Sequence, residues 1–456
     1  MSFLSKDLDL ASNSYYDATV ERAAARSALA GDIECDVAVV GGGLAGLSAA
    51  IELADRGHDV VLLEARRVGW GASGRNGGQA LAGLACDQDT VEAQLGLDEA
   101  RRVWAMTLEA LALIRQRCER FHIDCDWRSG YLSLAVNARK ARDLRAWHAR
   151  MQSLYGFETQ WIEPAQLSSW IDSPRFHSGL HDPASGHLHP LKYSLGLARG
   201  AAELGVRLFE NSPVTSLEPA ATAGSTVRVR TAAGSVRASH VLLAGNVYLQ
   251  GVAPVLESRI MPVGTYIVAS QRLDPALAQS LIPSGSAVCD TNFVLDYFRV
   301  ASNPAATSPD TEPREHRMLY GGRVSYSTAT PRDLKSSMQR RMASTFPQLA
   351  ATDVEFAWGG FVDISMNRAP DFGRLSDRDP RSGAGYANVY YVQGFSGHGL
   401  ALTGIAGRIV AEAIDGDARR FDTFSRLRHH AFPGGKLLRT PALVAGMAYH
   451  RLKDLL

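Results

Sequence analysis

A glycine motif near the N-terminus constrains this chain more than any other feature. Gly41, Gly43 and Gly46 follow the apolar run Asp36–Val40 and precede a helical pattern of apolar residues. Glycines at this spacing allow a tight turn, a close approach of the backbone to a pyrophosphate, and close packing of a helix on a strand. The motif therefore predicts a strand, a turn and a helix that bind a dinucleotide at the helix N-terminus.

A carboxylate completes this motif. Glu64 follows a second predicted strand, Asp59–Leu63, and lies 23 residues after Gly41. At that place a carboxylate can accept hydrogen bonds from both hydroxyls of an adenosine ribose. It would repel a 2′-phosphate, because two like charges would be forced together. A glycine turn in an ordinary α/β domain is the alternative interpretation of this βαβ unit.

The glycine motif alone does not distinguish NAD from FAD. Two further glycine-rich segments, Gly71–Gly78 and Gly394–Gly399, favour FAD, and the second one precedes a predicted helix. The tricyclic ring of a flavin needs close backbone approach on both sides. A helix N-terminus aimed at the ring would stabilise the negative charge of the reduced form. We therefore expect FAD as the cofactor.

Length and composition exclude several classes of protein. A chain of 456 residues needs more than one core or one large composite core. Its 48 basic and 47 acidic residues leave no excess of positive charge for a phosphate backbone, so no nucleic-acid partner is expected. The five cysteines are scattered and never spaced CxxC, which favours a reducing, cytoplasmic location. The sequence contains no run of 18 apolar residues, so no membrane span is predicted.

Three histidines raise the alternative of a metal site. His187 and His189 can place two imidazoles on one face of a strand, and His181 lies nearby in the sequence. No cysteine or carboxylate cluster completes a ligand set for zinc. We therefore expect no metal.

Motifs along almost the whole chain resemble one family. They are Ser14–Tyr16, Gly41–Gly46, Gly71–Gln79, Gly186–Pro190, Gly245–Asn246, Leu295–Arg299, Tyr320–Gly322, Trp358, Arg368, Pro370, Gly373–Arg374, Gly394–Gly399 and Phe432–Gly435. On these residues the chain resembles the D-amino-acid oxidase-like superfamily of flavin amine oxidases, and within it the oxidoreductases that act on gamma-glutamylputrescine.

The resemblance implies a fold of class α/β + β in two parts. A Rossmann-like FAD-binding domain is assembled from discontinuous segments, and a smaller antiparallel-sheet substrate domain lies over the isoalloxazine ring. The expected division is 33–122, 191–254 and 355–430 for the FAD-binding domain, 123–190 and 255–354 for the substrate domain, 1–32 for an N-terminal leader and 431–456 for a C-terminal tail.

The resemblance also implies the residues that contact the cofactor. They are Gly41, Gly43, Gly46, Glu64, Ser73, Arg75, Asn76, Gly397, His398 and Gly399. Arg75 is expected to pair with the pyrophosphate, with surface exposure as the alternative. His398 is expected either to hydrogen-bond near the flavin or only to orient its loop.

The cofactor is expected to be non-covalent. Some members of the superfamily tether the flavin through a cysteine, whereas Ser365, Met366, Asn367 and Arg368 occupy that segment here. Cys86 is the nearest thiol in sequence to a flavin loop, and a small buried hydrophobe is the favoured interpretation for it.

The implied reaction is oxidation of a primary amine to an imine, with oxygen reoxidising the flavin. Gamma-glutamylputrescine is the expected substrate, and an oxidase is favoured over a dehydrogenase. Two alternatives stay open: the same scaffold acting on another amine or amino acid, such as sarcosine, glycine or another glutamylated polyamine, and a non-catalytic nucleotide-binding protein.

The carboxylate of a glutamylated amine requires a recognition group. Period-two alternation places Tyr297 and Arg299 on one strand face, and Arg323 lies on a second predicted strand. If the two strands form a hairpin across Ser302–His316, an aromatic ring and a guanidinium line one side of the substrate site, where arginine pairs both carboxylate oxygens. Solvated strand residues are the alternative for both arginines. We predict Tyr297, Arg299 and His398 as the catalytic residues.

Overall fold

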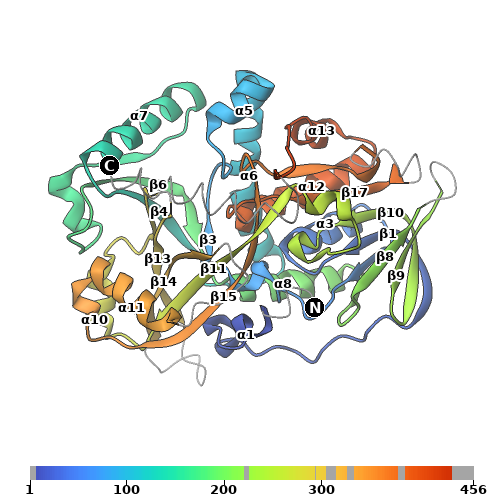
Figure 1. The fold of residues 1–456 in the computed structure, drawn as a ribbon, viewed down its shortest axis with the longest axis horizontal. Coiled ribbons are helices and arrows are strands. Elements are labelled where there is room, and N and C mark those ends of the chain that lie inside the picture. The colour runs from blue at the N-terminus through green and yellow to red at the C-terminus, as the bar shows by residue number, and fades with distance from the viewer. Residues whose placement is uncertain are drawn as a thin grey trace.

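Two large β-sheets lie side by side along the long axis of the molecule (Figure 1). The computed structural model describes residues 7–219, 225–292, 294–303, 315–325, 333–377 and 386–433. The chain passes back and forth between the two sheets, so that each is built from segments far apart in the sequence. The Rossmann-like part and the sheet-rich second part predicted from the sequence are both present.

The first sheet is mainly parallel. Its strands follow the order β16-β17-β10-β1-β2-β7, with β9 and β8 continuing from the N-terminal half of β10. Parallel strands need crossover connections, which here are helices or long excursions into the second sheet. The bounds are β1 Gly31–Val40, β2 Val60–Leu63, β7 Arg207–Phe209, β8 Val214–Glu218, β9 Val227–Thr231, β10 Gly234–Leu243, β16 Asp371–Arg374 and β17 Val389–Gln393.

Both faces of this sheet are buried, which explains its apolar strands. Val37 and Val39 point into the larger hydrophobic core with the helices, whereas Ala38 and Val40 point into a separate core on the opposite face. The helices of the larger core are α3 Leu44–Asp55, α6 Leu97–Arg120, α8 Pro190–Glu203, α12 Gly399–Ile414 and α13 Arg419–Ser425.

The second sheet is antiparallel except where β4 pairs with β12 in parallel. Its order is β15-β11-β14-β13-β12-β4-β6-β3, and β5 pairs with β6. The bounds are β3 Gln79–Ala80, β4 Arg128–Ala135, β5 Gln160–Ile162, β6 Ser178–His187, β11 Ile260–Ser270, β12 Ala287–Asp290, β13 Tyr297–Asn303, β14 Glu315–Ser325 and β15 Val354–Ser365.

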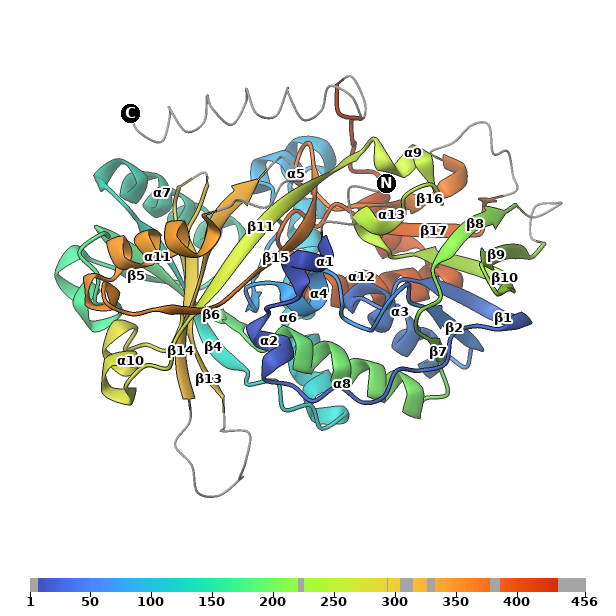
Figure 2. The same ribbon diagram turned by 60° about the horizontal axis from the view of Figure 1, so that its bottom comes forward.

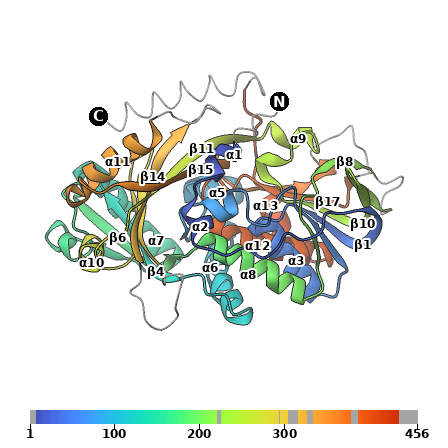
Figure 3. The ribbon, with the colours of Figure 1, turned by 90° about the horizontal axis from the view of Figure 1, so that it is seen from below.

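The two faces of the second sheet have different neighbours. One face packs under α10 (Pro275–Leu281) and α11 (Leu334–Thr345). The other contacts α1 (Asp7–Ala11), α2 (Tyr15–Ala18) and α4 (Ala72–Arg75), which Figure 2 shows between the two sheets. Figure 3 shows α6 and α8 running through the same middle region. The remaining helices are α5 Gln88–Leu95, α7 Ala138–Tyr155, α9 Pro254–Glu257 and short 3₁₀ turns at Pro164–Ser169, Asn246–Tyr248, Pro347–Leu349 and Leu375–Asp377.

Two predicted boundaries differ from the structure. β1 begins at Gly31 rather than Asp36, because its polar first half pairs with β10 from Gly234 onward. β15 pairs with β11 along its length and so belongs to the second sheet, although residues from 355 onward were assigned to the FAD-binding domain. The predicted hairpin is confirmed: β13 and β14 pair from Tyr297–Gly321 to Asn303–Glu315, and residues 304–314 lie outside the described residues.

Across the described ranges, no helix combines the length and apolar character needed to cross a bilayer. In the same part of the chain, no three His, Cys, Asp or Glu side chains group in a way that could hold a metal ion. The imidazoles of His187 and His189 instead make hydrogen bonds within the protein.

Candidate functional site

The glycine motif forms a turn that has no room for side chains. Gly41 has a φ of +114°, and a Cβ on it would lie 2.7 Å from the carbonyl oxygen of Ala244 in the neighbouring chain segment after β10. A Cβ on Gly46, inside α3, would lie 2.0 Å from the carbonyl oxygen of Gly41. Both positions therefore require glycine for steric reasons.

Ser73 lies at the N-terminus of α3. Gly43 is the N-cap residue there and has no side chain with which to cap the helix. The Leu44 N–H donates instead to Ser73 Oγ at 2.9 Å, so the first glycine loop, Gly71–Gly78, reaches the glycine motif. The N-terminus of a helix attracts anions, and this is the helix N-terminus at which the glycine motif predicts a pyrophosphate.

Glu64 stands at the carboxyl end of β2, next to the motif. Its carboxylate accepts from the Gly42 N–H at 2.7 Å and from the Arg66 N–H at 2.8 Å. Burial raises the pKa of Glu64, and these two N–H groups act in the opposite direction. The same carboxylate that shapes the turn is thus placed beside it, as the ribose-binding interpretation requires.

Arg75 differs from its prediction as a pyrophosphate ligand. Its guanidinium donates to both carboxylate oxygens of Asp7, at 2.9 and 3.1 Å, and to the Gly359 carbonyl at 2.8 Å. Contacts of 3.4 Å to the Gly71 carbonyl and the Tyr248 hydroxyl occupy its other N–H groups. All five N–H groups of the guanidinium therefore have protein partners. Arg75 is neither a surface residue nor free for a phosphate, because an aspartate in the leader neutralises it.

The Asn76 side chain is also used within its own loop. Its amide N–H groups donate to the carbonyls of Ala72 and Ser73 at 3.0 Å, and its oxygen accepts from the Gly78 N–H at 2.8 Å. These bonds end α4 and shape the turn that follows. The Asn76 side chain therefore supports the glycine loop rather than offering free groups to a cofactor.

The second glycine loop, Gly394–Gly399, is held in place by Asp363 on β15. The Gly394 N–H donates to the Asp363 carboxylate, and the Ser396 N–H donates to the Asp363 carbonyl at 3.0 Å. Burial raises the pKa of Asp363 to about 6, whereas the Gly394 N–H acts to lower it. This contact joins the second sheet to the loop that begins α12.

His398 has an unused polar atom at the N-terminus of α12. Its Nδ1 is shielded from solvent and has no hydrogen-bond partner among the described residues. Burial lowers the pKa of His398 to about 4, and the charge of Arg368 adds to that effect. The imidazole is therefore neutral near pH 7. Gly397 beside it has a φ of +97° and open space where a side chain would be.

Tyr297 faces the first glycine loop. A Cβ on Gly77 would lie 2.8 Å from its ring, and a Cβ on Gly321 would lie 2.2 Å from it. The ring therefore lies against two glycine backbones. Burial raises the pKa of Tyr297, so its hydroxyl stays protonated.

Arg299 shares this face and is only 3% exposed, so it is not a solvated strand residue. It donates to the Gly77 carbonyl at 2.9 Å, the Leu188 carbonyl at 3.0 Å and the Tyr16 hydroxyl at 3.3 Å. Its Nη1 donates to His187 Nδ1 at 3.3 Å. Within the described residues no carboxylate forms an ion pair with this guanidinium. The Arg323 side chain lies outside the described residues.

Several residues of this region were missed by sequence reasoning. Asp7 carried no local signal, because its partner Arg75 is 68 residues away. Tyr131 on β4 and Cys289 on β12 contact each other through their polar atoms, on the sheet face opposite the core of Leu132 and Val288. Strict alternation along both strands was the signal that could have found them.

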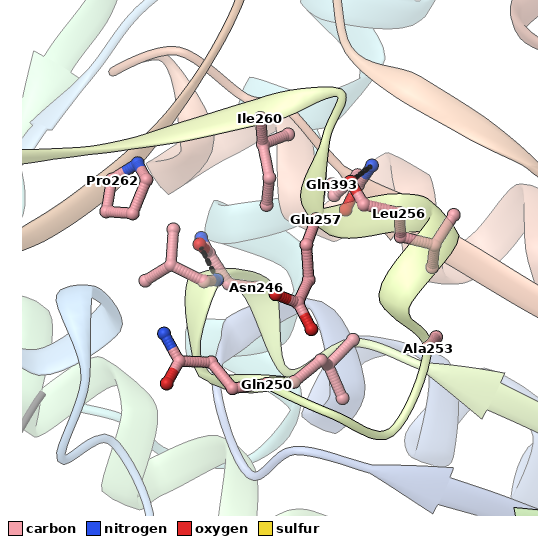
Figure 4. Close-up of a pocket in the computed structure, with 10 residues that line it drawn as sticks. Asn246, Gln250, Ala253, Leu256, Glu257, Ile260, Pro262 and Gln393 are labelled. Atoms are coloured by element: carbon pink, nitrogen blue, oxygen red, sulfur yellow. Dashed lines mark hydrogen bonds between the residues drawn. The ribbon is translucent and has the colours of Figure 1, made fainter. Parts of the chain in front are cut away.

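Two small cavities lie near these residues. Arg299 and Arg128 line one of them, together with His187, His189 and Asp126. The other follows β10, where Asn246, Glu257 and Gln393 surround the space drawn in Figure 4. Neither is lined by a residue of the glycine motif. The first is the one that a predicted site residue reaches.

The arrangement fits a flavin dinucleotide. A Cβ on Gly41 or Gly46 would collide with the protein backbone, so these glycines keep the turn before α3 tight, and the shielded Nδ1 of His398 lacks a partner among the described residues. Glu64 can accept from a ribose, the N-terminus of α3 can bind a pyrophosphate, and the N-terminus of α12 can stabilise a reduced ring. No residue assigned to these places opposes the expected charge.

The chain belongs to the family of FAD-dependent oxidoreductases named DAO, whose model matches residues 36–413. It is therefore an enzyme of the flavin-dependent oxidoreductase class. Over 443 residues it is 39% identical to gamma-glutamylputrescine oxidoreductase of Escherichia coli (strain K12), covering 97% of this chain and 98% of that protein. It is 37% identical over 424 residues to the probable oxidoreductase OrdL of Haemophilus influenzae, covering 92% of each.

Solved structures share the fold. Glycine oxidase from Geobacillus kaustophilus superposes with a TM-score of 0.66 at 21% identity, covering 84% of this chain and 95% of that one. L-proline dehydrogenase from P. horikoshii gives a TM-score of 0.66 at 19% identity, covering 86% and 98%. At these identities the likeness supports the architecture and says nothing about the substrate.

Proposed function

We propose that this enzyme oxidises the primary amine of gamma-glutamylputrescine to an imine, which water hydrolyses to gamma-glutamyl-aminobutyraldehyde and ammonia. The observation that carries the proposal is the 39% identity to gamma-glutamylputrescine oxidoreductase over 97% of this chain and 98% of that protein. Bound FAD supplies the acceptor for the hydride that leaves the carbon next to the amine nitrogen.

The glycine loops and Glu64 would hold the cofactor. Gly41, Gly43 and Gly46 would keep the backbone close to the pyrophosphate, and Ser73 Oγ already accepts from the Leu44 N–H at the start of α3. His398 and its flanking glycines Gly397 and Gly399 would lie at the ring. Its unpaired Nδ1 is the group that we expect to hydrogen-bond there.

Arg299 would bind the carboxylate of the glutamyl group. A buried cation without an anion is costly, and an anionic substrate would neutralise it. Four of the five N–H groups of the guanidinium donate to neutral protein acceptors, which leaves one on Nη1 for a ligand. The cavity lined by Arg299 and Arg128 is the place where that ligand would enter.

Apart from the Arg299 guanidinium, the groups expected around the reacting amine are neutral. Burial raises the pKa of Tyr297, Tyr131 and Cys289, and it lowers the pKa of His398 to about 4. Such surroundings disfavour a charged ammonium, because desolvation penalises the ionised form. The chain would therefore select the neutral amine, whose lone pair assists hydride loss from the adjacent carbon.

Steady-state kinetics test the substrate and the oxidant. The expected result is a kcat/KM for gamma-glutamylputrescine well above those for putrescine, sarcosine and glycine, with one hydrogen peroxide formed per aldehyde. A higher value for sarcosine or glycine would overturn the substrate. Turnover that needs an artificial acceptor and forms no peroxide would identify a dehydrogenase instead of an oxidase.

FAD binding would be non-covalent. Ser365, Met366, Asn367 and Arg368 offer no thiol for a tether, and the buried Cys86 has a pKa raised by burial to about 12. We expect acid or guanidinium to release all the yellow colour as FAD when the denatured protein is filtered. Colour retained on the polypeptide would contradict this, and release of FMN would contradict the cofactor.

A further inference from the structure

Two thiols meet where α6 ends. Cys118 lies in the last turn of that helix and Cys125 in the segment that follows, and their sulfur atoms are 3.4 Å apart. A disulfide bond has a length of about 2.05 Å, so a small movement of the side chains would join them. Both are free thiols in this structure.

The approach of the two thiols is built into the backbone. The Ile123 N–H donates to the Cys118 carbonyl at 2.8 Å, which folds the chain back over the end of the helix. His122 and Asp126 have positive φ values of 50° and 55°, which reverse the chain on either side of Cys125. A fixed reversal therefore holds the pair together.

The two thiols are not equivalent. Cys118 is partly exposed, whereas Cys125 is 2% exposed. The hydrogen bond from Cys125 lowers the pKa of Cys118, against the opposing effects of burial and of Asp124. The same contact and burial raise the pKa of Cys125, to which Asp126 and Asp124 add. Cys118 is thus the thiol that ionises first and that a small oxidant can reach.

We propose that Cys118 and Cys125 form a two-electron redox site that hydrogen peroxide converts to a disulfide. The Cys118 thiolate attacks one peroxide oxygen and breaks the O–O bond, giving a sulfenic acid and, with one proton, water. The Cys125 sulfur then attacks the Cys118 sulfur, forming the S–S bond and releasing hydroxide, which takes the Cys125 proton to become a second water. Two thiols and one peroxide thus give one disulfide and two waters.

The pair is connected to the wall of the Arg299 cavity. The Cys125 carbonyl accepts from the His189 N–H at 2.7 Å, and Asp126 pairs with Lys192 at 2.8 Å. His189 and Lys192 belong to the start of α8, and His189 and Asp126 line that cavity. The disulfide would join the end of α6 to the segment at Cys125 and Asp126, which contacts the start of α8. Peroxide as the local oxidant rests on the proposed oxidase function, but the reactivity of the pair does not.

Peptide mapping of the holoenzyme tests the proposal with added peroxide. The reduced enzyme is treated with a few equivalents of hydrogen peroxide, alkylated in denaturant and digested with trypsin. Cleavage after Arg117, Arg120 and Arg128 places the thiols on separate peptides, 118–120 and 121–128. We expect these two peptides joined, lighter than their sum by two hydrogens, with two of the five thiols lost and both restored by dithiothreitol.

Three variants serve as comparisons. Cys118→Ser and Cys125→Ser should each lose the cross-link, whereas Cys35→Ser, which removes another partly exposed thiol, should cross-link as the wild type does. Complete alkylation of Cys118 and Cys125 after peroxide treatment would overturn the proposal. Oxidation of Cys118 to sulfinic acid without a cross-link would also overturn it. The wild-type map decides the matter even if a variant fails to fold. An enzyme that forms no peroxide from amines would remove only the local source of oxidant.

Discussion

At the scale of single residues, two buried arginines differ in whether their charge is balanced within the protein. Arg75 is neutralised by Asp7, with every N–H group paired, so its charge is already used by the fold. Arg299 is equally buried, yet within the described residues its partners are neutral carbonyls, a hydroxyl and an imidazole. The unbalanced charge is the property that suits it to an anionic substrate.

Arg299→Ala should lower kcat/KM for gamma-glutamylputrescine, because the substrate carboxylate loses a charge-assisted hydrogen bond. The lost binding free energy is about 1.5–3 kcal/mol. Putrescine, which has no carboxylate, should be oxidised at nearly the wild-type rate. The measurement is kcat/KM for both amines, with flavin content as the control. An equal loss on both amines together with loss of FAD would show that Arg299 only supports Gly77.

The glycine motif gives a second prediction at this scale. Gly46→Ala should abolish FAD binding, because the new Cβ would lie 2.0 Å from the Gly41 carbonyl oxygen and displace the turn. Gly404→Ala is the matched control, since Gly404 is also inside a helix and its new Cβ would lie 3.5 Å from the Leu113 side chain, an ordinary van der Waals contact. Absorbance of the purified proteins at 450 nm is the readout. Full flavin occupancy in Gly46→Ala would contradict this account of the turn.

At the scale of elements, the ion pair of Asp7 and Arg75 fastens α1 to α4 and β15. Both side chains are buried, and the guanidinium also binds the Gly359 carbonyl of β15. Asp7→Asn would leave a buried charge without its partner, which costs about 3–5 kcal/mol. We expect a clear drop in the urea midpoint at fixed FAD concentration. The same midpoint in Asp7→Asn as in the wild type would show that the leader is not fastened here.

The control for that prediction is an exposed pair. Asp98→Asn removes a surface contact with Arg101, in which the aspartate side chain is 87% exposed. Exposed ion pairs contribute little to stability, so no measurable change is expected. A drop as large as that of Asp7→Asn would show that the assay reports net charge rather than burial.

Local sequence patterns predicted the helices and strands, whereas the partners of individual side chains depend on contacts between distant residues. The apolar run, the glycines and Glu64 specified the βαβ unit because their signal spans few residues. The face shared by Tyr297 and Arg299 was predictable from alternation alone. Asp7 was not, because an ion pair across 68 residues leaves no periodic trace.

At the scale of the whole molecule, two sheets are built from alternating chain segments, and Arg299 on β13 contacts the glycine-rich loop at Gly77. In the proposed site the amine would meet the neutral side chains of Tyr297, Tyr131 and Cys289. A free alkylammonium has a pKa of about 10.4, and desolvation lowers it. Because only the neutral amine reacts, the rate of flavin reduction should rise with pH through the pKa of the bound amine and then level off.

His398 should add no second inflection to that profile. Burial lowers its pKa to about 4, so it is already neutral across the range from about pH 6 to 10. Stopped-flow reduction over this range is the measurement. A rate that does not vary with pH would contradict the selection of neutral amine, and an inflection near 6.5 that disappears in His398→Asn would contradict a neutral His398.

Anaerobic reduction of the bound flavin tests directly whether gamma-glutamylputrescine is the substrate. The holoenzyme is mixed with gamma-glutamylputrescine, putrescine, sarcosine or glycine in the absence of oxygen, and the absorbance at 450 nm is followed. We expect rapid and complete bleaching by gamma-glutamylputrescine, with much slower bleaching by the other three. A flavin that stays oxidised with gamma-glutamylputrescine, or one that glycine or sarcosine bleaches faster, would contradict it.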